Sequence, residues 1–408
     1  MVGKSLKSVY AEIKKPSPVV MVVIAMTVLL FLVITMVVIP SRPVYTLFFG
    51  HSIKISSIKY SMLPQIATSG NNVYVVWQGS ATGNGDIYFR ASRNSGMTFG
   101  NTINLSHDIG TSSSPQIAAN RNNVYVVWID NSTGKSDIYF KKSTNNGANF
   151  SSEQIISSKI SGRSQFPQIA ESLNNVYVVW IANNNGQDNV YFRASRNNGA
   201  NFSSEQIISS KISERPFSTG ITTSGNNVYV VWQGNGQHNI YFRASRNGGT
   251  TFGNAINLSH DIGTSSSPQI AANRIQRNDD VYVVWTRNIA GKSDIYFRLS
   301  NDTGTKFGRT INLSHNIEAS FSTRISTSGN NVPVVWVANN NGQHDIYFRA
   351  IAVGGTTFGN TINLSHDIGT SSSPQIAADR NNVYVIWVNN TPANSEIYFK
   401  RVTWSLIF

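Results

Sequence analysis

Three arginines interrupt an otherwise repeated pattern, and the chemistry available to them is anion binding. Arg163 and Arg215 each lie four residues before the same point of a recurring motif, P-Q-I-A, in the segments SGRSQF and SERPFS. Arg324 lies in T-R-I, where other copies have P-Q-I. A guanidinium donates hydrogen bonds in a planar fork that fits a carboxylate, so three of them around one point would hold an anion. The alternative is that they are solvated loop arginines in a basic chain.

Two more side chains are candidates for acid–base or nucleophilic chemistry beside these arginines. Glu214 directly precedes Arg215, and Tyr60 is the only tyrosine at the start of a first strand. The other glutamates are scattered, and no aspartate stands in the context of a general acid. The candidates for a catalytic centre are therefore Arg163, Arg215, Arg324, Glu214 and Tyr60, and the residues alone do not establish that the chain is an enzyme.

Histidine–aspartate pairs in the string S-H-D-I-G raise the question of a metal or a catalytic triad. These pairs are His107 with Asp108, His260 with Asp261 and His366 with Asp367, and His315 with Asn316 is a variant. Because most of them are separated by one or more whole repeats, they belong to different structural units and do not predict one site. Oxygen-rich loops such as 130–137 and 183–188 lack the ligand order of a calcium-binding loop. We expect no metal and no cofactor.

A repeat of about 50 residues organises the chain that must position these side chains. The string V-Y-V-V-W and its variants end at seven tryptophans, whose spacings are 51, 52, 52, 53, 51 and 51 residues: Trp77, Trp128, Trp180, Trp232, Trp285, Trp336 and Trp387. Each unit reads P-Q-I-A, an N-N turn, the apolar run, a Gly/Asn loop, D-I-Y-F-R, a second turn and I-N-L-S or Q-I-I-S. We interpret this order as four short strands per unit.

Seven units of four strands predict an all-β fold, a seven-bladed β-propeller. Closing the ring removes free sheet edges, whereas an open solenoid would need distinct capping units that are not visible. The seventh unit lacks its own I-N-L-S strand, and residues 53–56 (I-K-I-S) resemble the missing piece. We expect this segment to pair with the C-terminal strand and close the ring. The seven tryptophans are expected in the core, between stacked blades.

A turn motif of the form S-x-N-x-G-x-x-F joins the third and fourth strands of the units. Asparagine or aspartate caps backbone N–H groups there, and glycine takes a positive φ. A degenerate sixth copy ends at Phe358. The five complete copies are Ser92, Asn94, Gly96 and Phe99; Ser143, Asn145, Gly147 and Phe150; Ser195, Asn197, Gly199 and Phe202; Ser245, Asn247, Gly249 and Phe252; and Ser300, Asp302, Gly304 and Phe307.

This motif resembles the Asp box, S-x-D-x-G-x-T-[WF], of the sialidase-like (BNR-repeat) β-propellers, over residues about 53–408. The resemblance implies the propeller fold, with Asp boxes away from the active site. It also implies, for the sialidases, three arginines that hold a carboxylate, a Tyr nucleophile assisted by Glu, and an Asp acid/base at the centre of the ring. Arg324 resembles the arginine of the family's [FY]-R-I-P motif, although Ser326 replaces its proline. The family also contains proteins without hydrolase activity.

Arginines that recur in several units are interpreted as structural, because a catalytic centre is asymmetric. These are Arg90, Arg193, Arg243, Arg298 and Arg349 of the D-I-Y-F-R strings. We expect them to pair across strands with the Asp or Asn that begins the same string.

A 21-residue run without charge, residues 19–39, precedes the repeats. It is long enough to cross a bilayer and longer than the apolar region of a cleaved signal peptide. Four lysines precede the run and only Arg42 follows closely, so the positive-inside rule places the N-terminus in the cytoplasm. The expected organisation is a cytoplasmic segment 1–18, a transmembrane signal anchor 19–39, a linker 40–52 and an extracellular propeller 53–408. A cleaved signal peptide is the alternative.

Nine N-x-[ST] sequons are consistent with an extracellular propeller, although an Asn-rich chain also produces them by chance. They lie at Asn104, Asn131, Asn149, Asn201, Asn257, Asn301, Asn312, Asn363 and Asn389.

Composition excludes several classes of protein. The 408 residues contain no cysteine, which excludes disulfide scaffolds, Cys-ligated metals and thiol catalysis. The net charge of +13 is spread thinly outside the N-terminal segment, without the basic stripe of a nucleic-acid-binding protein.

We therefore expect a membrane-anchored surface propeller that binds a glycan or a protein at the cell surface, and near-identical units suit multivalent binding. The alternatives are a sialidase-like exo-glycosidase with an arginine-lined central funnel and a structural cell-envelope protein.

Overall fold

The computed structural model describes residues 44–407 except for short gaps at 81–82, 108–109, 211, 213, 261–262, 276, 316, 318, 328, 330, 341, 353–356, 367–368, 380 and 392–393. The predicted cytoplasmic segment 1–18 and transmembrane segment 19–39 lie outside this range. Within it, every regular element is a β-strand, and no helix is long and apolar enough to cross a membrane. One compact unit covers Leu47–Trp404.

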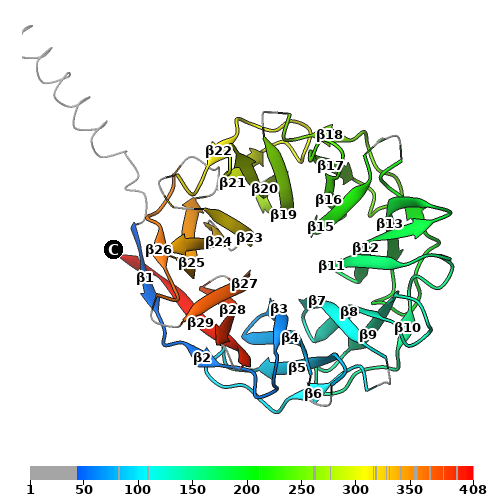
Figure 1. The fold of residues 1–408 in the computed structure, drawn as a ribbon, viewed down its shortest axis with the longest axis horizontal. Helices are drawn as coiled ribbons and strands as arrows, with labels where there is room; N and C mark the ends of the chain where they lie inside the picture. Colours follow the sequence, from blue (N-terminus) through cyan, green and yellow to red (C-terminus); the bar gives the residue numbers. More distant parts are fainter. Residues whose placement is uncertain are drawn as a thin grey trace, which may run out of the picture. The chain divides into compact units, whose positions relative to one another are not determined.

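Seven antiparallel sheets form this unit, arranged as the blades of a ring (Figure 1). Blade 1 contains β3 (Met62–Ser69), β4 (Asn72–Gly79), β5 (Asp86–Ser92) and β6 (Ile103–Asn104). Blade 2 contains β7 (Ser112–Asn120), β8 (Asn123–Asp130), β9 (Asp137–Ser143) and β10 (Gln154–Ile155). Blade 3 contains β11 (Ser164–Ser172), β12 (Asn175–Asn184), β13 (Gln187–Ser195) and β14 (Gln206–Ile207). Blade 4 contains β15 (Pro216–Ser224), β16 (Asn227–Gly234), β17 (Ile240–Ser245) and β18 (Ile256–Asn257).

The remaining blades follow the same order from the centre of the ring outward. Blade 5 contains β19 (Thr264–Ile275), β20 (Asn278–Ile289), β21 (Lys292–Ser300) and β22 (Ile311–Asn312). Blade 6 contains β23 (Ser320–Ile325), β24 (Asn331–Asn340), β25 (Gln343–Ala352) and β26 (Ile362–Asn363). Blade 7 contains β27 (Thr370–Ala378), β28 (Asn382–Thr391) and β29 (Asn394–Ile407), and it is completed by β1 (Val44–Phe49) and β2 (Ile53–Lys54) from the other end of the described chain. The predicted seven-bladed propeller of four-stranded blades is confirmed.

Closure of the ring occurs in blade 7, as predicted. Ile53 and Lys54 of β2 pair antiparallel with Phe399 and Tyr398 of β29. The hydroxyl of Ser56 then accepts the backbone N–H of Ile397 at 2.9 Å, and Ile55 is 1% exposed. β1 forms within residues 40–52, the stretch expected to be a linker, because V-Y-T-L-F-F consists of β-branched, aromatic and apolar residues suited to a strand.

The core lies between blades rather than beneath one sheet. The second strand of each blade is apolar on both faces because a neighbouring blade covers each face. All seven tryptophans of the repeat are 0% exposed, and each stacks on or tilts against a tyrosine of the third strand, as Trp180 does on Tyr191 at 5.8 Å. The prediction that they are core residues is confirmed.

The Asp-box turns join neighbouring blades. In the first copy, the amide oxygen of Asn94 accepts the backbone N–H of Thr98 at 2.9 Å, and the hydroxyl of Ser92 accepts that of Gly96 at 2.9 Å. Gly96 has φ +78°, and a Cβ there would collide with the ring of Phe399 in the preceding blade. Phe99 meets the same ring edge-on at 5.1 Å. Glycine is required both for the backbone conformation and for this close approach.

The other four complete copies of the turn have the same arrangement. The side-chain oxygen at the third position of each copy accepts the backbone N–H four residues later, and these acceptors are Asn145, Asn197, Asn247 and Asp302. The glycine of each copy has a positive φ and lies against a phenylalanine of the preceding blade: Gly147 against Phe89, Gly199 against Phe140, Gly249 against Phe192 and Gly304 against Phe242. The aromatic residue that ends each copy meets that same ring edge-on, at 4.9–5.1 Å between centroids, and these residues are Phe150, Phe202, Phe252 and Phe307. The motif therefore acts as a joint between blades, and its residues are structural.

The recurring cations of the third strands bind the preceding blade, which corrects the expected pairing with Asp or Asn of the same string. Arg193 donates to the carbonyls of Ser203, Phe202 and Ile156, and Ile156 belongs to blade 2. The corresponding cation in each of the other blades donates to the equivalent carbonyl, as Arg90 does to Ile55, Lys141 to Leu105, Arg243 to Ile208, Arg298 to Leu258, Arg349 to Leu313 and Lys400 to Leu364. Backbone carbonyls at a blade boundary need donors, and a long cationic side chain reaches them.

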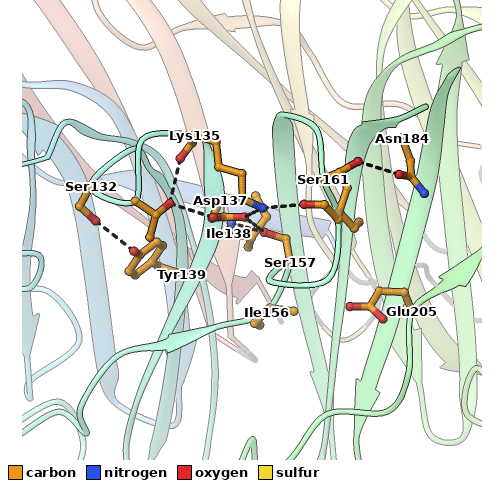
Figure 2. A network of polar contacts seen from close by, with 12 residues as sticks. Ser132, Lys135, Asp137, Ile138, Tyr139, Ile156, Ser157, Ser161, Asn184 and Glu205 are labelled. Atoms are coloured by element: carbon orange, nitrogen blue, oxygen red, sulfur yellow. Dashed lines mark hydrogen bonds and ion pairs between the residues drawn. The ribbon is translucent and has the colours of Figure 1, made fainter. Parts of the chain in front are cut away.

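The aspartate of D-I-Y-F instead fastens the fourth strand within its own blade. Figure 2 shows Asp137 between Lys135 and Ser157 in blade 2. Ser157 donates to Asp137 at 2.8 Å and accepts the backbone N–H of Ile138 at 2.8 Å. Because this arrangement recurs at Asp86 and Asp294, it is a structural feature of the blade.

Candidate functional site

The ring has two unlike faces. The turns between first and second strands and the Asp-box turns share one face, where Asn146 donates its backbone N–H to Asn122 O at 2.7 Å. We call this the Asp-box face. The first strands begin on the opposite face, beside the hairpins between second and third strands, and we call it the arginine face because it carries Arg163 and Arg215.

The Asp-box face repeats from blade to blade. Three shallow grooves among the described residues lie between successive Asp-box turns, each bounded by an aromatic residue of one turn and by a residue of the next. Such equivalence makes this face a poor place for a single asymmetric site.

Arg215 lies on the arginine face at the start of blade 4, where it pairs with an acid of blade 3. Its Nε and Nη2 donate to Oδ2 of Asp188 at 3.0 and 2.5 Å. The Arg215 side chain is 66% exposed and that of Asp188 is 18% exposed. An exposed ion pair of this kind stabilises the fold by about 0–1 kcal/mol. Because the pair uses only the Nε and Nη2 atoms, the remaining guanidinium donors are available to a ligand.

Glu214 organises the neighbouring hairpin of blade 4. Its carboxylate accepts hydrogen bonds from the Tyr241 hydroxyl at 2.7 Å, the Asn239 amide at 3.0 Å and the Gln237 backbone N–H at 3.1 Å. The carboxylate fills the space in which a Cβ on Gly234 would stand. Burial raises the pKa of Glu214, but these hydrogen bonds outweigh it, and the net shift is downward. Glu214 is therefore an ionised positioning residue for the segment that carries Arg215.

The Tyr241–Glu214 contact is a tyrosine–glutamate pair, the combination that the family resemblance implies for a nucleophile. Burial, together with the hydrogen bond to Glu214 and its charge, raises the pKa of Tyr241 to about 12. The Tyr241 hydroxyl is therefore protonated and donates its hydrogen bond to the Glu214 carboxylate.

An aromatic pair stands beside these charges. Phe166 of blade 3 and Phe217 of blade 4 have ring centroids 5.3 Å apart, with planes inclined at 53°. Phe217 is 50% exposed. Phe166 has φ +51° at a β-bulge of the first strand, where one extra residue shifts the register between Gln165 and Gln168. The same bulge recurs in the first strands of blades 1, 2, 5, 6 and 7, so it is a structural feature of the blades rather than of this site.

The other two predicted loop residues lie on the rim. Arg163 is exposed and donates to the Gln165 side chain at 3.1 Å. Tyr60 is 54% exposed, and its backbone N–H donates to Asn394 at 3.0 Å, which places it where blade 1 meets blade 7.

Arg324 lies on the innermost strand of blade 6 and points toward blade 7. Its Nε donates to the Gln375 side chain at 2.9 Å and its Nη1 to the Thr323 carbonyl at 2.9 Å. Burial lowers its pKa to about 10, although part of the side chain still meets solvent. No carboxylate of the described residues pairs with it. In most other blades the equivalent residue is a glutamine, so the guanidinium is an asymmetric cation on the inner wall of the ring.

The three arginines lie on three blades. Arg163 and Arg215 are exposed directly before the first strands of blades 3 and 4, and Arg324 lies on the first strand of blade 6. At the boundary of blades 3 and 4, Arg215 contacts Asp188 and Phe166 contacts Phe217, and Glu214 directly precedes Arg215 in the chain. We call these five residues the blade 3–4 cluster.

Sequence reasoning found only two members of this cluster, Glu214 and Arg215. Asp188 and the aromatic pair were missed because their proximity depends on how two blades stack. The replacement of small serines by Phe166 and Phe217 at the start of the first strand was the available signal.

The histidines of S-H-D-I-G lie in exposed loops, as His107 and His260 show. The residues that follow them are outside the described residues. No group of three or more His, Asp or Glu side chains suitable for a metal occurs in the part of the chain that the structure describes.

The sequons fall into two groups. Asn131, Asn149, Asn201 and Asn301 are exposed. The asparagines of the I-N-L-S strands are half-buried and occupied: Asn363, for example, donates to Asp345 at 2.7 Å and accepts the Ser365 N–H at 3.1 Å. Asn389 is 7% exposed. The structure thus leaves four accessible sequons.

Comparison with solved structures identifies glycan-active proteins with the same fold. The chain is similar to polysaccharide lyase Uly1, with a TM-score of 0.59 and 9% identity over 87% of this chain and 99% of that one. It is similar to a PL25 ulvan lyase bound to -[GlcA(1-4)Rha3S]-, with a TM-score of 0.57 and 12% identity over 88% and 96%. It is also similar to the phage phi92 endosialidase, with a TM-score of 0.53 and 10% identity over 87% and 69%.

A scan of protein-family models finds no match, and neither does a search of curated proteins. The likeness at this identity shows a sialidase-like propeller fold.

Proposed function

We propose that this propeller is a membrane-anchored, extracellular module that binds an acidic glycan at the blade 3–4 cluster. One observation carries the proposal: on the arginine face, an aromatic pair lies on the first strands of blades 3 and 4, and the exposed guanidinium of Arg215 directly precedes the second of these strands. Sugars present C–H faces that pack on aromatic rings, and their carboxylates or sulfates take bidentate bonds from arginine. Both groups are missing from the corresponding positions of the serine-containing blades 2, 5 and 7.

The acidic character of the ligand follows from the charges. Arg215 keeps free donors after pairing with Asp188, and Arg163 is exposed at the equivalent place of blade 3. Glu214 is already saturated by three donors, so it does not serve as a ligand group. Residues 1–40 hold four lysines and one glutamate, so residues 41–408 carry +10 of the net charge of +13, and this charge favours acidic ligands at long range. The solved neighbours include a polysaccharide lyase and an endosialidase, which supports a glycan as the ligand class.

The location is part of the proposal. Residues 19–39 are long enough to span a bilayer, and the lysines before them favour a cytoplasmic N-terminus. The propeller would then face outward, where glycans are abundant.

Binding to a glycan panel tests the site. The fragment 41–408 contains the whole compact unit Leu47–Trp404 and is screened against uronate-containing, sulfated, sialylated and neutral glycans. We expect acidic glycans to bind, and Phe217→Ala and Arg215→Gln each to weaken binding at least tenfold. Met97→Ala is the matched control, because Met97 is 61% exposed on the Asp-box face. Equal affinity of all variants, or no binding to any acidic glycan, would overturn the proposal.

The second candidate function is a sialidase-like exo-glycosidase, and the observation that favours it is Arg324. A partly buried guanidinium held by neutral acceptors on the inner wall of the ring can receive a substrate carboxylate. The panel for this activity consists of fluorogenic aryl glycosides, sialosides included, together with polyuronates assayed for an unsaturated lyase product. Turnover lost in Arg324→Ala but kept in Arg163→Ala would favour the enzyme over the binding module.

A further inference from the structure

The outermost strand of blade 7 presents an apolar edge. β1 is the terminal strand of its sheet, next to β29, and lies on the perimeter of the ring (Figure 1). Phe48 is 59% exposed and Phe49 39% exposed. The strand V-Y-T-L-F-F contains no charge. Immediately after it, Gly50 donates its backbone N–H to Arg401 O at 2.9 Å, which fixes the strand to blade 7.

Such an edge is a liability in a soluble protein. An uncharged edge strand with exposed aromatic side chains templates association, and natural sheets blunt their edges with charge, proline or a covering element. β1 contains neither a charged residue nor a proline, and among the described residues no further strand pairs with its outer side. We therefore expect something outside the ring to contact the outer edge of β1.

The covalent chain indicates what that cover is. Phe48 is the ninth residue after Ile39, the end of the uncharged run, and nine residues span at most about 30 Å even when fully extended. If residues 19–39 cross a bilayer, Phe48 is tethered within that distance of the hydrocarbon boundary. Aromatic side chains concentrate in the interfacial layer of a membrane, where an apolar ring and a hydrated backbone are both accommodated.

We propose that Phe48 and Phe49 insert into the interfacial layer of the lipid bilayer, so that the outer edge of blade 7 rests on the membrane. This inference rests on the membrane anchor of the proposed function and is independent of the glycan site. Contact through the perimeter leaves both faces of the ring, and hence the blade 3–4 cluster, open to ligands.

Depth-dependent quenching tests the contact on the full-length chain. The sequence contains no cysteine, so Phe48→Cys carries a single environment-sensitive fluorophore without further changes. Phe49→Cys is the second reporter in case one variant does not fold. Met97→Cys, 61% exposed on the Asp-box turn of blade 1, is the matched control. Each labelled chain is reconstituted in phosphatidylcholine vesicles with and without lipids that carry a spin-label quencher near the headgroup.

Two measurements separate the outcomes. Flotation with the vesicles after alkaline extraction reports the anchor, and quenching reports the contact. We expect flotation of all variants, with at least threefold stronger quenching at positions 48 and 49 than at position 97. Flotation with equal quenching at all three positions would refute the contact while keeping the anchor. Failure of the chain to float with the vesicles would overturn both the membrane anchor and the contact of Phe48 and Phe49 with the bilayer. A label shielded from water but not quenched by lipid, together with a dimer on cross-linking, would show that a second copy covers the edge.

Discussion

Replacing Glu171 by glutamine should stabilise the propeller at neutral and alkaline pH and leave its stability nearly unchanged in acid. Glu171 lies near the end of the first strand of blade 3, where the other blades carry threonine or alanine. Its Oε2 atom is buried without a hydrogen-bond partner among the described residues. Burial raises the pKa of its carboxyl to about 7, with a hydrogen bond from Asn120 opposing the shift.

The magnitude follows from linkage between protonation and folding. The pKa rises from 4.5 in the unfolded chain to about 7 in the folded one, and each pKa unit corresponds to about 1.4 kcal/mol. Below pH 4.5 the Glu171 carboxyl is protonated in both the folded and the unfolded chain, and the free energy of unfolding has its full value. Between pH 4.5 and 7 the unfolded state loses its proton first, so stability falls by up to about 3 kcal/mol and is constant above pH 7. For roughly 360 residues, this corresponds to about 4 °C in Tm.

Calorimetric melting at pH 4.5 and pH 8 measures the effect. We expect Glu171→Gln to raise Tm by about 4 °C over the unsubstituted chain at pH 8 and by less than about 1 °C at pH 4.5. Glu153→Gln is the control, because this partly exposed acid forms an ion pair with Lys141 and its loss should not stabilise the fold. A gain of equal size at both pH values, or a loss at pH 8, would refute the reasoning, since neither depends on a proton bound by the folded state.

Three further perturbations probe the joints between blades, and Gly134→Ala is a control for the first of them. Gly147→Ala should destabilise the fold by about 3 kcal/mol or more in urea unfolding, because φ is +80° and the new Cβ would collide with the ring of Phe89. Gly134→Ala, at φ +85° with open space around it, should cost only about 1 kcal/mol. Arg193→Met should cost about 2 kcal/mol, since three carbonyls lose a charged donor, and a change of less than about 0.5 kcal/mol would contradict the inter-blade role. A chain that begins at Ser57 should melt at least 5 °C lower and expose blade 7 to proteolysis, and an unchanged melting temperature would show that the closing strand is dispensable.

Much of the fold was predictable from local patterns. The regular spacing of the tryptophans predicted seven blades, because each unit carries its own strands and turns. The absence of a fourth strand in the last unit, with Ile53 and Lys54 left over at the start, predicted the closure that the pairing with Phe399 and Tyr398 confirms. These features depend on residues close in sequence or on simple counting.

The candidate site was predictable only in part, because its geometry depends on neighbouring blades. Glu214 and Arg215 were recognised as departures from the repeat, but the partner of Arg215 is Asp188 of the preceding blade. Likewise, Arg193 was expected to pair with an acid or amide of its own strand, whereas it reaches the Ile156 carbonyl of the preceding blade. Such contacts follow from the angle at which blades stack, which no local pattern encodes.

The closing strand also sets the timing of biosynthesis. Lys54 bonds to Glu396, 342 residues later in the chain, and at about 5–20 residues per second these two residues leave the ribosome on the order of half a minute apart. Six blades can therefore form while the ring is still an open arc, with the flank of blade 1 uncovered. Near-identical blades in such an arc can pair with the wrong neighbour or with another chain. The uncovered flank of blade 1 is therefore the part of the unfinished ring most open to misassembly before the last strand emerges.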